Sequence, residues 1–528
     1  MTTSLSSNLK SINPSNLEEL ADLQTTPSTG VVEAVKLSRQ AMQSWSALTL
    51  EQRLAKIENF RQLLIERKDG IAKLITLESG KPLLESYLEL SGPLDTCLWL
   101  SKNAKDVLAR QDIHLSSPFM WGKRHYLQLE PLGVVGIISP WNYPLSIPVM
   151  SMLMALAAGN TVVLKPSEKT PLIGLRIGEL FNQAGFPANV VTVITGDGLV
   201  GRELASLELG RLIFTGSINT GTKIINTVAP NLTPLTLELG GKDPAIVLPD
   251  APIERTAKAI VWGAFTNTGQ ACASIERVYL IKDKNNEALL SKIVEFVGKL
   301  RVGDPLLPTT EVGPLIDVQQ FDHVVNQVEQ AIRAGAKVLC GGGTLTSLGL
   351  QLRDQGLNGY FYEPTVITNV NHSMKIMQEE TFGPVLPIMI VDSVEEAIKL
   401  ANETHYGLTA SIWSTNAQQA QAIANKLQAG TVFINDGLYT HAVAALPWGG
   451  VKKSGLGRSH SHLGLLDLVH VKHISVDNAL WLPRIWWYPY HDSKLKAIRS
   501  GLEFLHSKVI GSKLTSLFGF LGNVFRNN

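Results

Sequence analysis

Strands and helices alternate along the middle of the sequence, and this alternation is the feature that most limits the folds open to the chain. Between residues 133 and 241, β-branched runs are separated by segments in which apolar residues recur at helical spacing. The runs are GVVGII, TVVLKP, VVTVITG, RLIFTGS and LTLELGG. Such a rhythm predicts an α/β fold with a doubly wound, mostly parallel sheet, a Rossmann-like arrangement that binds a dinucleotide at the carboxyl ends of its strands.

A second α/β alternation begins at residue 243, with the runs PAIVLP, KVLCGG, LPIMIV and GTVFIN. At 528 residues the chain exceeds what one hydrophobic core usually organises. We therefore expect a dinucleotide-binding domain over 1–112 and 132–238, a catalytic α/β domain over 239–453, and an active site between them. Amphipathic helices are predicted at 31–48, 50–77 and 81–110.

Composition excludes several classes of protein. The 47 basic and 46 acidic residues give no excess charge that would attract nucleic acid. Three cysteines without a CxxC pair argue against disulfides or a zinc site. The N-terminus has no export signal, so we expect a cytoplasmic location. Residues 131–164 carry no charge, but prolines and glycines divide them into strand, turn and helix, which favours a buried centre over a bilayer span.

Two loops suggest where a cofactor would bind. VVLKPSE places Lys165 and Glu168 at the carboxyl end of a buried strand, where a ribose would lie, although a solvated loop pair explains the same residues. FTGSINTG leads from a strand into a helix between Gly216 and Gly221, so free N–H groups could face a pyrophosphate. A plain helix cap at Ser217 explains this loop equally well.

LELGGK and GQACASIER carry the stronger signal, since they supply Glu238 and Cys272. Oxidation of an aldehyde by a hydride acceptor requires a thiolate that adds to the carbonyl and a base that activates water against the thioester. The alternative for Cys272 is a buried structural cysteine. The small neighbours Ala271 and Ala273 favour an accessible sulfur, and a helix N-terminus there would lower its pKa.

Eight segments in order resemble the aldehyde dehydrogenase superfamily over residues 30–478. They are LESGKP, PLGVVGIISPWNYP, VVLKPSE, FTGS, LELGGKDP, GQACASIER, EETFGPV and LPWGGVKKSGLGR. The resemblance implies catalytic roles for Cys272, Glu238 and Asn142, with the Asn142 amide and the Cys272 N–H forming an oxyanion hole. Glu238 favours hydrolysis over transfer to coenzyme A, because relatives that use coenzyme A lack this glutamate. No metal is required.

The same resemblance assigns the cofactor, NAD with NADP as an alternative, to one set of residues and the substrate to another. Cofactor contacts are implied for Ile138, Ser139, Trp141, Lys165, Glu168, Gly216, Ser217, Gly221, Glu380 and Phe382. The substrate mouth is implied to contain Tyr143, Ser146, Ile147, Met150, Ala271, Ala273 and Trp448. None of these mouth residues is cationic, which favours a medium- or long-chain aliphatic or other apolar aldehyde. NDGLYTHAVAALPWGG resembles the fatty aldehyde dehydrogenases, whereas SIERVYL keeps succinate semialdehyde as the alternative.

The hairpin at 113–131 and the strand at 465–479 resemble the family's β-hairpin oligomerisation arm, which implies a homodimer or homotetramer. Residues 480–528 form a basic amphipathic tail beyond the resemblance to soluble relatives, with seven basic residues against two acidic ones. Leu495, Ile498, Leu502, Leu505 and Val509 recur at helical spacing, and five aromatic residues precede them. Two interpretations stay open for this tail: peripheral membrane contact, or packing on the enzyme's own surface.

Overall fold

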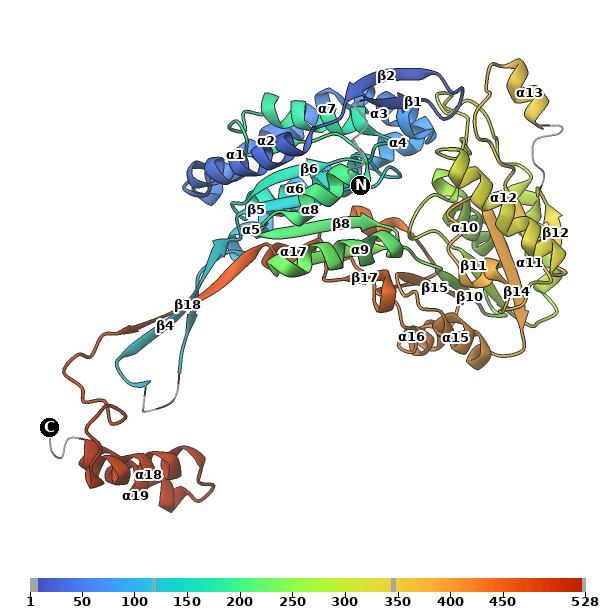
Figure 1. Cartoon of the computed structure of the whole chain (residues 1–528). Coiled ribbons are helices and arrows are strands. Elements are labelled where there is room, and N and C mark those ends of the chain that lie inside the picture. The colour runs from blue at the N-terminus through green and yellow to red at the C-terminus, as the bar shows by residue number, and fades with distance from the viewer. Residues whose placement is uncertain (1–7, 116, 118–119, 343–347, 525–528) are drawn as a thin grey trace. The chain divides into compact units, whose positions relative to one another are not determined.

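The computed structural model describes residues 8–115, 117, 120–342 and 348–524. The chain divides into two compact units (Figure 1). The larger unit consists of Met1–Val107 and Pro131–Val469, and the smaller unit of Leu108–Glu130 and His470–Asn528. The larger unit contains two α/β sheets, so the predicted fold class is confirmed.

The first sheet has the strand order β17-β9-β8-β5-β6-β7. All neighbours are parallel except β17 and β9. The chain runs from β5 outward to β6 and β7, then returns to build β8 and β9 on the other side, so the strand order reverses beside β5. A crevice at such a reversal is where doubly wound sheets bind their ligands. The strands are β5 (Val134–Ile138), β6 (Thr161–Lys165), β7 (Val191–Val193), β8 (Arg211–Gly216), β9 (Leu235–Leu239) and β17 (Gly455–Leu456).

Amphipathic helices cover this sheet and pack their apolar faces against its strands. Its core joins strand residues such as Val163 and Leu212 to Val31 and Leu204 of the covering helices. The uncharged stretch 131–164 forms β5, α6 and β6, and the residues of these elements are mostly buried. The helices are α1 (Ser28–Ser46), α2 (Leu50–Glu66), α3 (Lys68–Ser79), α4 (Leu83–Glu89), α5 (Ser91–Val107), α6 (Ser146–Ala157), α7 (Pro171–Gln183), α8 (Gly198–Ser206), α9 (Ile218–Val228) and α17 (Ser461–Leu466).

Two helices expected to be continuous are each divided. The segment 50–77 breaks at Arg67, whose backbone (φ −99°, ψ 7°) leaves the helical region. The segment 81–110 breaks at Leu90, and a new helix begins at Ser91. Pro93 explains the second break, because proline fits the first turn of a helix but disrupts its interior. Among the described residues, no helix combines the length and the apolar character needed to cross a bilayer.

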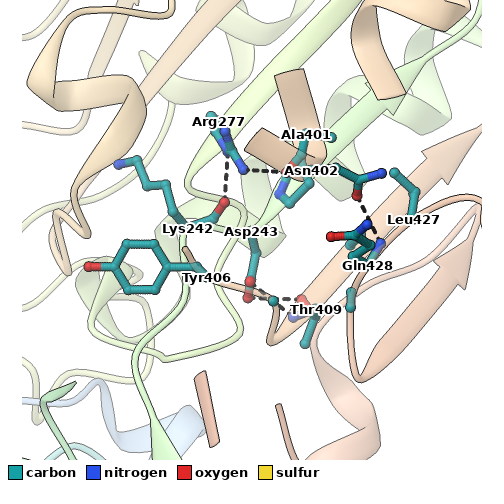
Figure 2. Close-up of a pocket in the computed structure, with 13 residues that line it drawn as sticks. Lys242, Asp243, Arg277, Ala401, Asn402, Tyr406, Thr409, Leu427 and Gln428 are labelled. Atoms are coloured by element: carbon teal, nitrogen blue, oxygen red, sulfur yellow. Dashed lines mark hydrogen bonds between the residues drawn. The ribbon is translucent and has the colours of Figure 1, made fainter. Parts of the chain in front are cut away.

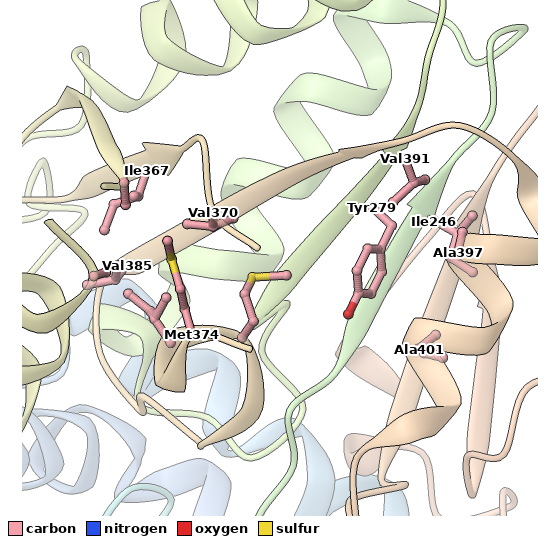
Figure 3. Packing of buried hydrophobic residues seen from close by; sticks show 14 of the residues in the cluster. Ile246, Tyr279, Ile367, Val370, Met374, Val385, Val391, Ala397 and Ala401 are labelled. Atoms are coloured by element: carbon pink, nitrogen blue, oxygen red, sulfur yellow. The ribbon is translucent and has the colours of Figure 1, made fainter. Parts of the chain in front are cut away.

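The second sheet has the order β12-β13-β14-β11-β10-β15-β16, with only β12 antiparallel to its neighbour. Alternate residues of β10 serve opposite faces: Ile246 joins one core (Figure 3), and Ala245 and Val247 join the other. This alternation is the period of a strand buried on both faces. The strands are β10 (Pro244–Val247), β11 (Arg277–Ile281), β12 (Lys337–Cys340), β13 (Thr365–Thr368), β14 (Val385–Val391), β15 (Thr409–Trp413) and β16 (Thr431–Ile434).

Helices again flank the second sheet, and one of the two cores is closed by Ala397 and Ala401 (Figure 3). These helices are α10 (Ile253–Phe265), α11 (Asn286–Val297), α12 (Val318–Arg333), α13 (Leu348–Asp354), α14 (Lys375–Gln378), α15 (Val394–Glu403) and α16 (Ala417–Ala424). A separate hairpin of β1 (Asn8–Ile12) and β2 (Glu19–Gln24) precedes α1.

The smaller unit combines a three-stranded sheet with a pair of helices. The sheet has the order β18-β4-β3, from β3 (Gln111–Ile113), β4 (Lys123–Pro131) and β18 (Val469–Asp477). The segments expected to form the arm therefore pair with each other within one chain. The tail forms α18 (Asp492–His506) and α19 (Ile510–Val524), which pack together as a hairpin.

Candidate active site

Cys272 lies in a turn between the short 3₁₀ helix η3 (Thr266–Gly269) and β11. No helix begins at this residue, so the expectation that a helix N-terminus would lower its pKa is wrong. Burial instead raises the pKa of the Cys272 thiol well above its usual range, and the carboxyl groups of Asp243, Glu380 and Glu238 add to the rise. Cys272 is neither fully buried nor disulfide-bonded, so its sulfur keeps access to the site.

Left-handed backbone conformations shape the loop before Cys272. Asn267 (φ 51°) and Thr268 (φ 58°) both adopt them, which costs free energy for residues other than glycine. Contacts on several sides compensate. The Asn267 N–H donates to Glu85 (2.7 Å), and the Thr268 hydroxyl donates to the Gly313 carbonyl (3.2 Å). The surrounding fold therefore imposes the conformation that presents Cys272.

Glu238 lies at the carboxyl end of β9, held between β8 and β17. Its Oε1 accepts a hydrogen bond from the Ser459 hydroxyl (3.0 Å), whereas its buried Oε2 has no partner among the described protein atoms. Burial raises the pKa of Glu238 to about 8, against the opposing effects of the Ser459 hydrogen bond and the Arg458 charge. A buried carboxyl with one unengaged oxygen is suited to exchange a proton near neutral pH.

Cys272 and Glu238 line one cavity of about 310 Å³, at the carboxyl ends of β8 and β9. A thiol and a carboxyl of raised pKa in one cavity can perform acyl transfer followed by hydrolysis. Besides these two, six residues predicted from the sequence line this cavity: Trp141, Asn142, Gly216, Ser217, Glu380 and Phe382. Pro140, Thr215, Leu239, Gly240, Gln320 and His323 complete it.

Asn142 is fixed against the loop that carries Cys272. Its side-chain Nδ2 donates to the Gln270 carbonyl (3.0 Å), and its backbone carbonyl accepts from Asn267 Nδ2 (3.1 Å). A primary amide has two N–H donors, so the contact with Gln270 leaves the second one for another acceptor. The expected pairing with Cys272 is therefore compatible with this geometry, in which the amide donates to Gln270.

The residues expected to hold a ribose lie together at the end of β6. Lys165 is buried and its Nζ donates to Glu168 Oε2 (3.0 Å). Although burial opposes the change, the Lys165 charge and hydrogen bonds lower the pKa of Glu168. Neither residue lines the cavity that contains Cys272. Ile138 is the last residue of β5 and Ser139 follows it, and the buried Ser139 hydroxyl has no partner among the described atoms.

Ser217 caps the N-terminus of α9, where its Oγ accepts from the Thr220 N–H (3.3 Å). The capping interpretation is thus confirmed, and it does not exclude a ligand, because Ser217 also lines the cavity. Gly221 packs against Leu239, which explains a glycine one turn into the helix. On the opposite wall, Glu380 Oε1 accepts from the Gly241 N–H (3.0 Å), and a Cβ on Gly240 would collide with the same carboxylate.

A sequence profile of the aldehyde dehydrogenase family matches residues 1–474. The chain belongs to this family. A betaine aldehyde dehydrogenase of Beta vulgaris is 34% identical over 90% of this chain and 94% of its own length. Human retinaldehyde dehydrogenase 3 is 37% identical over 88% of each chain. The crystal structure of a Staphylococcus aureus betaine aldehyde dehydrogenase in complex with NAD⁺ is 33% identical, with a TM-score of 0.85 over 91% of this chain and 96% of that chain.

The protein is accordingly an oxidoreductase that acts on aldehydes with NAD(P) as acceptor. Within the family, the expected similarity to fatty aldehyde dehydrogenases is not supported, because these relatives are named for betaine aldehyde and retinaldehyde. These relatives establish the family, but they act on different aldehydes and so do not identify the substrate of this enzyme.

Two of the residues expected at the substrate mouth of this aldehyde dehydrogenase pack against Cys272, and most of the others are buried. Ala273 and Trp448 form a buried cluster against which Cys272 packs. Burial raises the pKa of Tyr143, with smaller contributions from Glu85, Glu89 and Cys272. Ala271, Ser146 and Ile147 are buried. Met150 is fully buried too, and the space beside it is set by Gly92 of α5, where a Cβ would meet the Met150 sulfur at 2.8 Å.

Buried ion pairs support the dehydrogenase site, and these were not singled out from the sequence. Glu276 binds Lys242 (2.7 Å) and accepts from the N–H groups of Thr381 (3.0 Å) and Phe382 (2.8 Å). It thereby connects the loop after Cys272 to the loop that carries Glu380. The signal was available, because Glu276 and Lys242 are charges inside otherwise apolar or glycine-rich motifs.

A second set of contacts fixes the strand ends behind the site (Figure 2). Arg277 is buried and its Nε donates to the Lys242 carbonyl (2.7 Å), while Asp243 accepts from the N–H and hydroxyl of Thr409 (both 2.9 Å). The void that these residues line is about 10 Å³, close to the size of one water molecule. It is too small for a substrate, and we assign it to packing.

Proposed function

We propose that this enzyme oxidises an apolar, medium- or long-chain aldehyde to the carboxylic acid through a thiohemiacetal and a thioester on Cys272. The observation that carries the proposal is the shared cavity of Cys272 and Glu238, in which one Glu238 oxygen has no partner among the residues that the structure describes. The domain division predicted from the sequence fits this reading, with one sheet presenting Glu238 and the loop before the second presenting Cys272.

The residues of the larger unit fit a dinucleotide. The cavity lies where the strand order reverses, and the unpartnered Ser139 hydroxyl and the capped start of α9 offer polar groups there. We infer that Lys165 and Glu168 bind the adenine ribose, Ser217 the pyrophosphate and Glu380 the nicotinamide ribose. Ile138, Ser139, Trp141, Gly216, Gly221 and Phe382 would shape the cleft. Bound NAD(P)⁺ supplies the hydride acceptor.

The chain's own groups account for the remaining chemistry. The Cys272 thiol first loses its proton to solvent, and the resulting thiolate adds to the aldehyde carbon. The second N–H of Asn142 and the Cys272 N–H stabilise the negative charge that develops on the oxygen. Loss of the aldehyde hydrogen as hydride leaves a thioester. Glu238 then removes a proton from water, whose oxygen attacks the thioester carbon and releases the acid and the Cys272 thiolate. No step requires a metal.

Kinetics of two variants test these roles. Cys272→Ala should abolish turnover while coenzyme binding, followed by fluorescence titration, persists. Glu238→Gln should allow a burst of NADH and then little steady-state turnover, because only hydrolysis of the thioester is slowed. Turnover by Cys272→Ala would overturn the assignment, and an equal loss of burst and steady state would remove Glu238 from its role.

The substrate proposal rests on the character of the predicted mouth. Tyr143, Ser146, Ile147, Met150, Ala271, Ala273 and Trp448 carry no positive charge. Lys81 lies 3.8 Å from the Tyr143 ring centre, but it is buried and paired with Glu89. An anionic substrate would find no unpaired cation among these residues. We therefore expect kcat/KM to rise with chain length across a series of aliphatic aldehydes; a maximum at succinate semialdehyde would favour the alternative.

We infer a preference for NAD over NADP. Glu168 keeps its negative charge beside Lys165, so its carboxylate can accept from a 2′-hydroxyl and repel a 2′-phosphate. The positive charge of Lys165 could pair with a 2′-phosphate, so NADP remains the alternative hydride acceptor. Glu168→Ala should narrow the preference in kcat/KM; no change in that ratio would mean that the carboxylate does not contact the ribose.

We also propose a cytoplasmic homodimer or homotetramer that touches a membrane peripherally through residues 480–528. The sheet of the smaller unit, which resembles the family's oligomerisation arm, supports the homo-oligomer. The basic amphipathic helices α18 and α19 support the membrane contact. A substrate that partitions into lipid would be consistent with such a contact.

A further inference from the structure

The smaller unit exposes an aromatic segment, residues 480–491, between β18 and α18. Trp481 is 77% exposed, Trp487 62% and Tyr488 82%. The Lys494 ammonium of α18 donates to the Trp487 carbonyl (2.7 Å), which anchors the segment to the helix. Large aromatic side chains are seldom left in water to this extent, so the segment is suited to an environment other than bulk solvent.

The two helices carry more apolar side chains than their own packing uses. Ala497 of α18 clusters with Phe520 of α19, and Gly501 and Ser516 are buried as well. Gly519 allows close approach of the helices, because a Cβ there would lie 2.9 Å from Ser500 Oγ. Other apolar residues remain exposed at helical spacing. These are Leu495 and Leu502 on α18, and Ile510, Leu514 and Phe518 on α19.

Positive charge accompanies this apolar surface. The described residues of α18, α19 and the connection between them include Lys494, Lys496, Arg499, Lys508 and Lys513 against Asp492 and Glu503. Glu503 Oε2 accepts from the Ser516 hydroxyl (2.8 Å), so part of the acidic charge is engaged between the helices. The net charge of the surface is positive, and its complement is anionic.

An apolar cavity of about 330 Å³ opens under the aromatic segment. Its single charged wall residue, Arg484, is buried and paired with Asp477. The other wall residues described are uncharged and come from Trp121 and Gly122, from residues 479–486, and from Phe520, Leu521 and Val524 of α19. A space of this size and character can accept a hydrocarbon chain.

We propose that the aromatic segment and the exposed faces of α18 and α19 bind the surface of an anionic lipid bilayer. Tryptophan and tyrosine favour the headgroup level, the exposed leucines and Phe518 enter the acyl boundary, and the basic side chains meet the lipid charge. The inference rests on the peripheral contact proposed above and goes beyond it by naming the surface and the lipid charge. It does not depend on the aldehyde.

A second copy of this chain is the main competing occupant. It would bring an identical basic surface, so five positive residues would face five others, and lysine is depleted at the centres of protein interfaces. The charge therefore favours lipid over a second copy.

Co-sedimentation of the full-length enzyme with vesicles tests the proposal. We expect binding to phosphatidylcholine vesicles that contain phosphatidylglycerol, weak binding to phosphatidylcholine alone, and release by high salt. Trp481→Ser/Trp487→Ser/Tyr488→Ser should weaken binding more than about tenfold, because the lost burial is apolar. Lys496→Gln/Arg499→Gln/Lys508→Gln should cost roughly fivefold per charge.

Matched controls come from the larger unit. Leu232 is 87% exposed, so Leu232→Ser changes an equally exposed apolar side chain and should leave binding unaltered. All variants should keep dehydrogenase activity on a water-soluble aldehyde, which shows that they fold. Equal binding by the wild-type and both triple variants would overturn this surface but keep a membrane contact. No binding of the wild-type enzyme to vesicles would overturn both the surface and the membrane contact. If the triple variants form a smaller assembly than the wild type in light scattering, the surface binds a second copy of the chain instead.

Discussion

The carboxyl group of Glu238 is the side chain whose protonation should govern turnover. Because burial raises its pKa to about 8, most molecules hold it protonated at pH 7, and only the ionised form accepts a proton from water. Ionisation increases as pH rises, so thioester hydrolysis should increase by up to about tenfold per pH unit and level off above about pH 8. Steady-state kcat measured against pH checks this. A flat profile through pH 8 would contradict the role.

Ser459 is a positioning residue for that carboxyl group. Its hydroxyl donates to Glu238 Oε1 and lowers the Glu238 pKa, while its backbone exchanges two hydrogen bonds with Trp448 (both 2.8 Å). Ser459→Ala should therefore move the rise of kcat to higher pH and reduce kcat severalfold at pH 7, with little change above the plateau. Ser459→Thr retains the hydroxyl and should restore the profile. A uniform loss at all pH values would indicate only a packing defect.

At the scale of elements, the loops around the site depend on charges that other segments bury. Glu276→Gln removes one partner of the Lys242 pair, and breaking a buried pair costs about 3–5 kcal/mol. We expect a lower midpoint of thermal unfolding and weaker NAD binding, because Glu276 also holds the N–H groups of Thr381 and Phe382.

Glu254→Gln provides the control for that prediction. Glu254 pairs with Lys258 (2.9 Å) on the exposed face of α10, and such pairs contribute at most about 1 kcal/mol. Calorimetry should show a clearly lower unfolding midpoint for Glu276→Gln than for Glu254→Gln, and coenzyme titration should show weaker NAD binding for Glu276→Gln alone. Similar midpoints would mean that Glu276 does not hold the two loops together.

Strands and long helices were predictable from the sequence because their signals are local. The five predicted strands from 133 to 241 all occur, since β-branched runs between turns specify them without outside help. The turn at Cys272 was not predictable in the same way. Its shape depends on Glu85 and Gly313, which lie far away in the sequence and supply contacts that no periodicity announces. The motifs found Cys272, Glu238 and Glu380, but not the burial that raises the pKa values of all three groups.

At the scale of the whole molecule, the sheet β18-β4-β3 offers a surface through which subunits could associate. β18 ends the sheet, so one of its edges is available to a strand of another subunit, as the family's arm suggests. Val471→Pro and Lys472→Pro remove N–H donors that point to opposite edges, because successive donors alternate along a strand. One of the two should shift the mass in light scattering toward 57.5 kDa.

Val471→Thr keeps the donor and the branched side chain and should leave the assembly unchanged. If both proline variants retain the wild-type mass, the arm is not the interface. If both become monomeric, the strand as a whole has lost its structure, and circular dichroism would register the loss.

The short strand β17 ties catalysis to the order of synthesis. Gly455 and Leu456 pair with Glu238 and Leu237, so the strand that presents the base is completed by residues more than 200 positions later. Ser459, which orients the same carboxyl group, arrives with them. A chain emerging from the ribosome therefore contains Cys272 long before its base is held in place. Such a nascent chain should be unable to complete a turnover, and the thiol becomes part of a working enzyme only when translation is nearly finished.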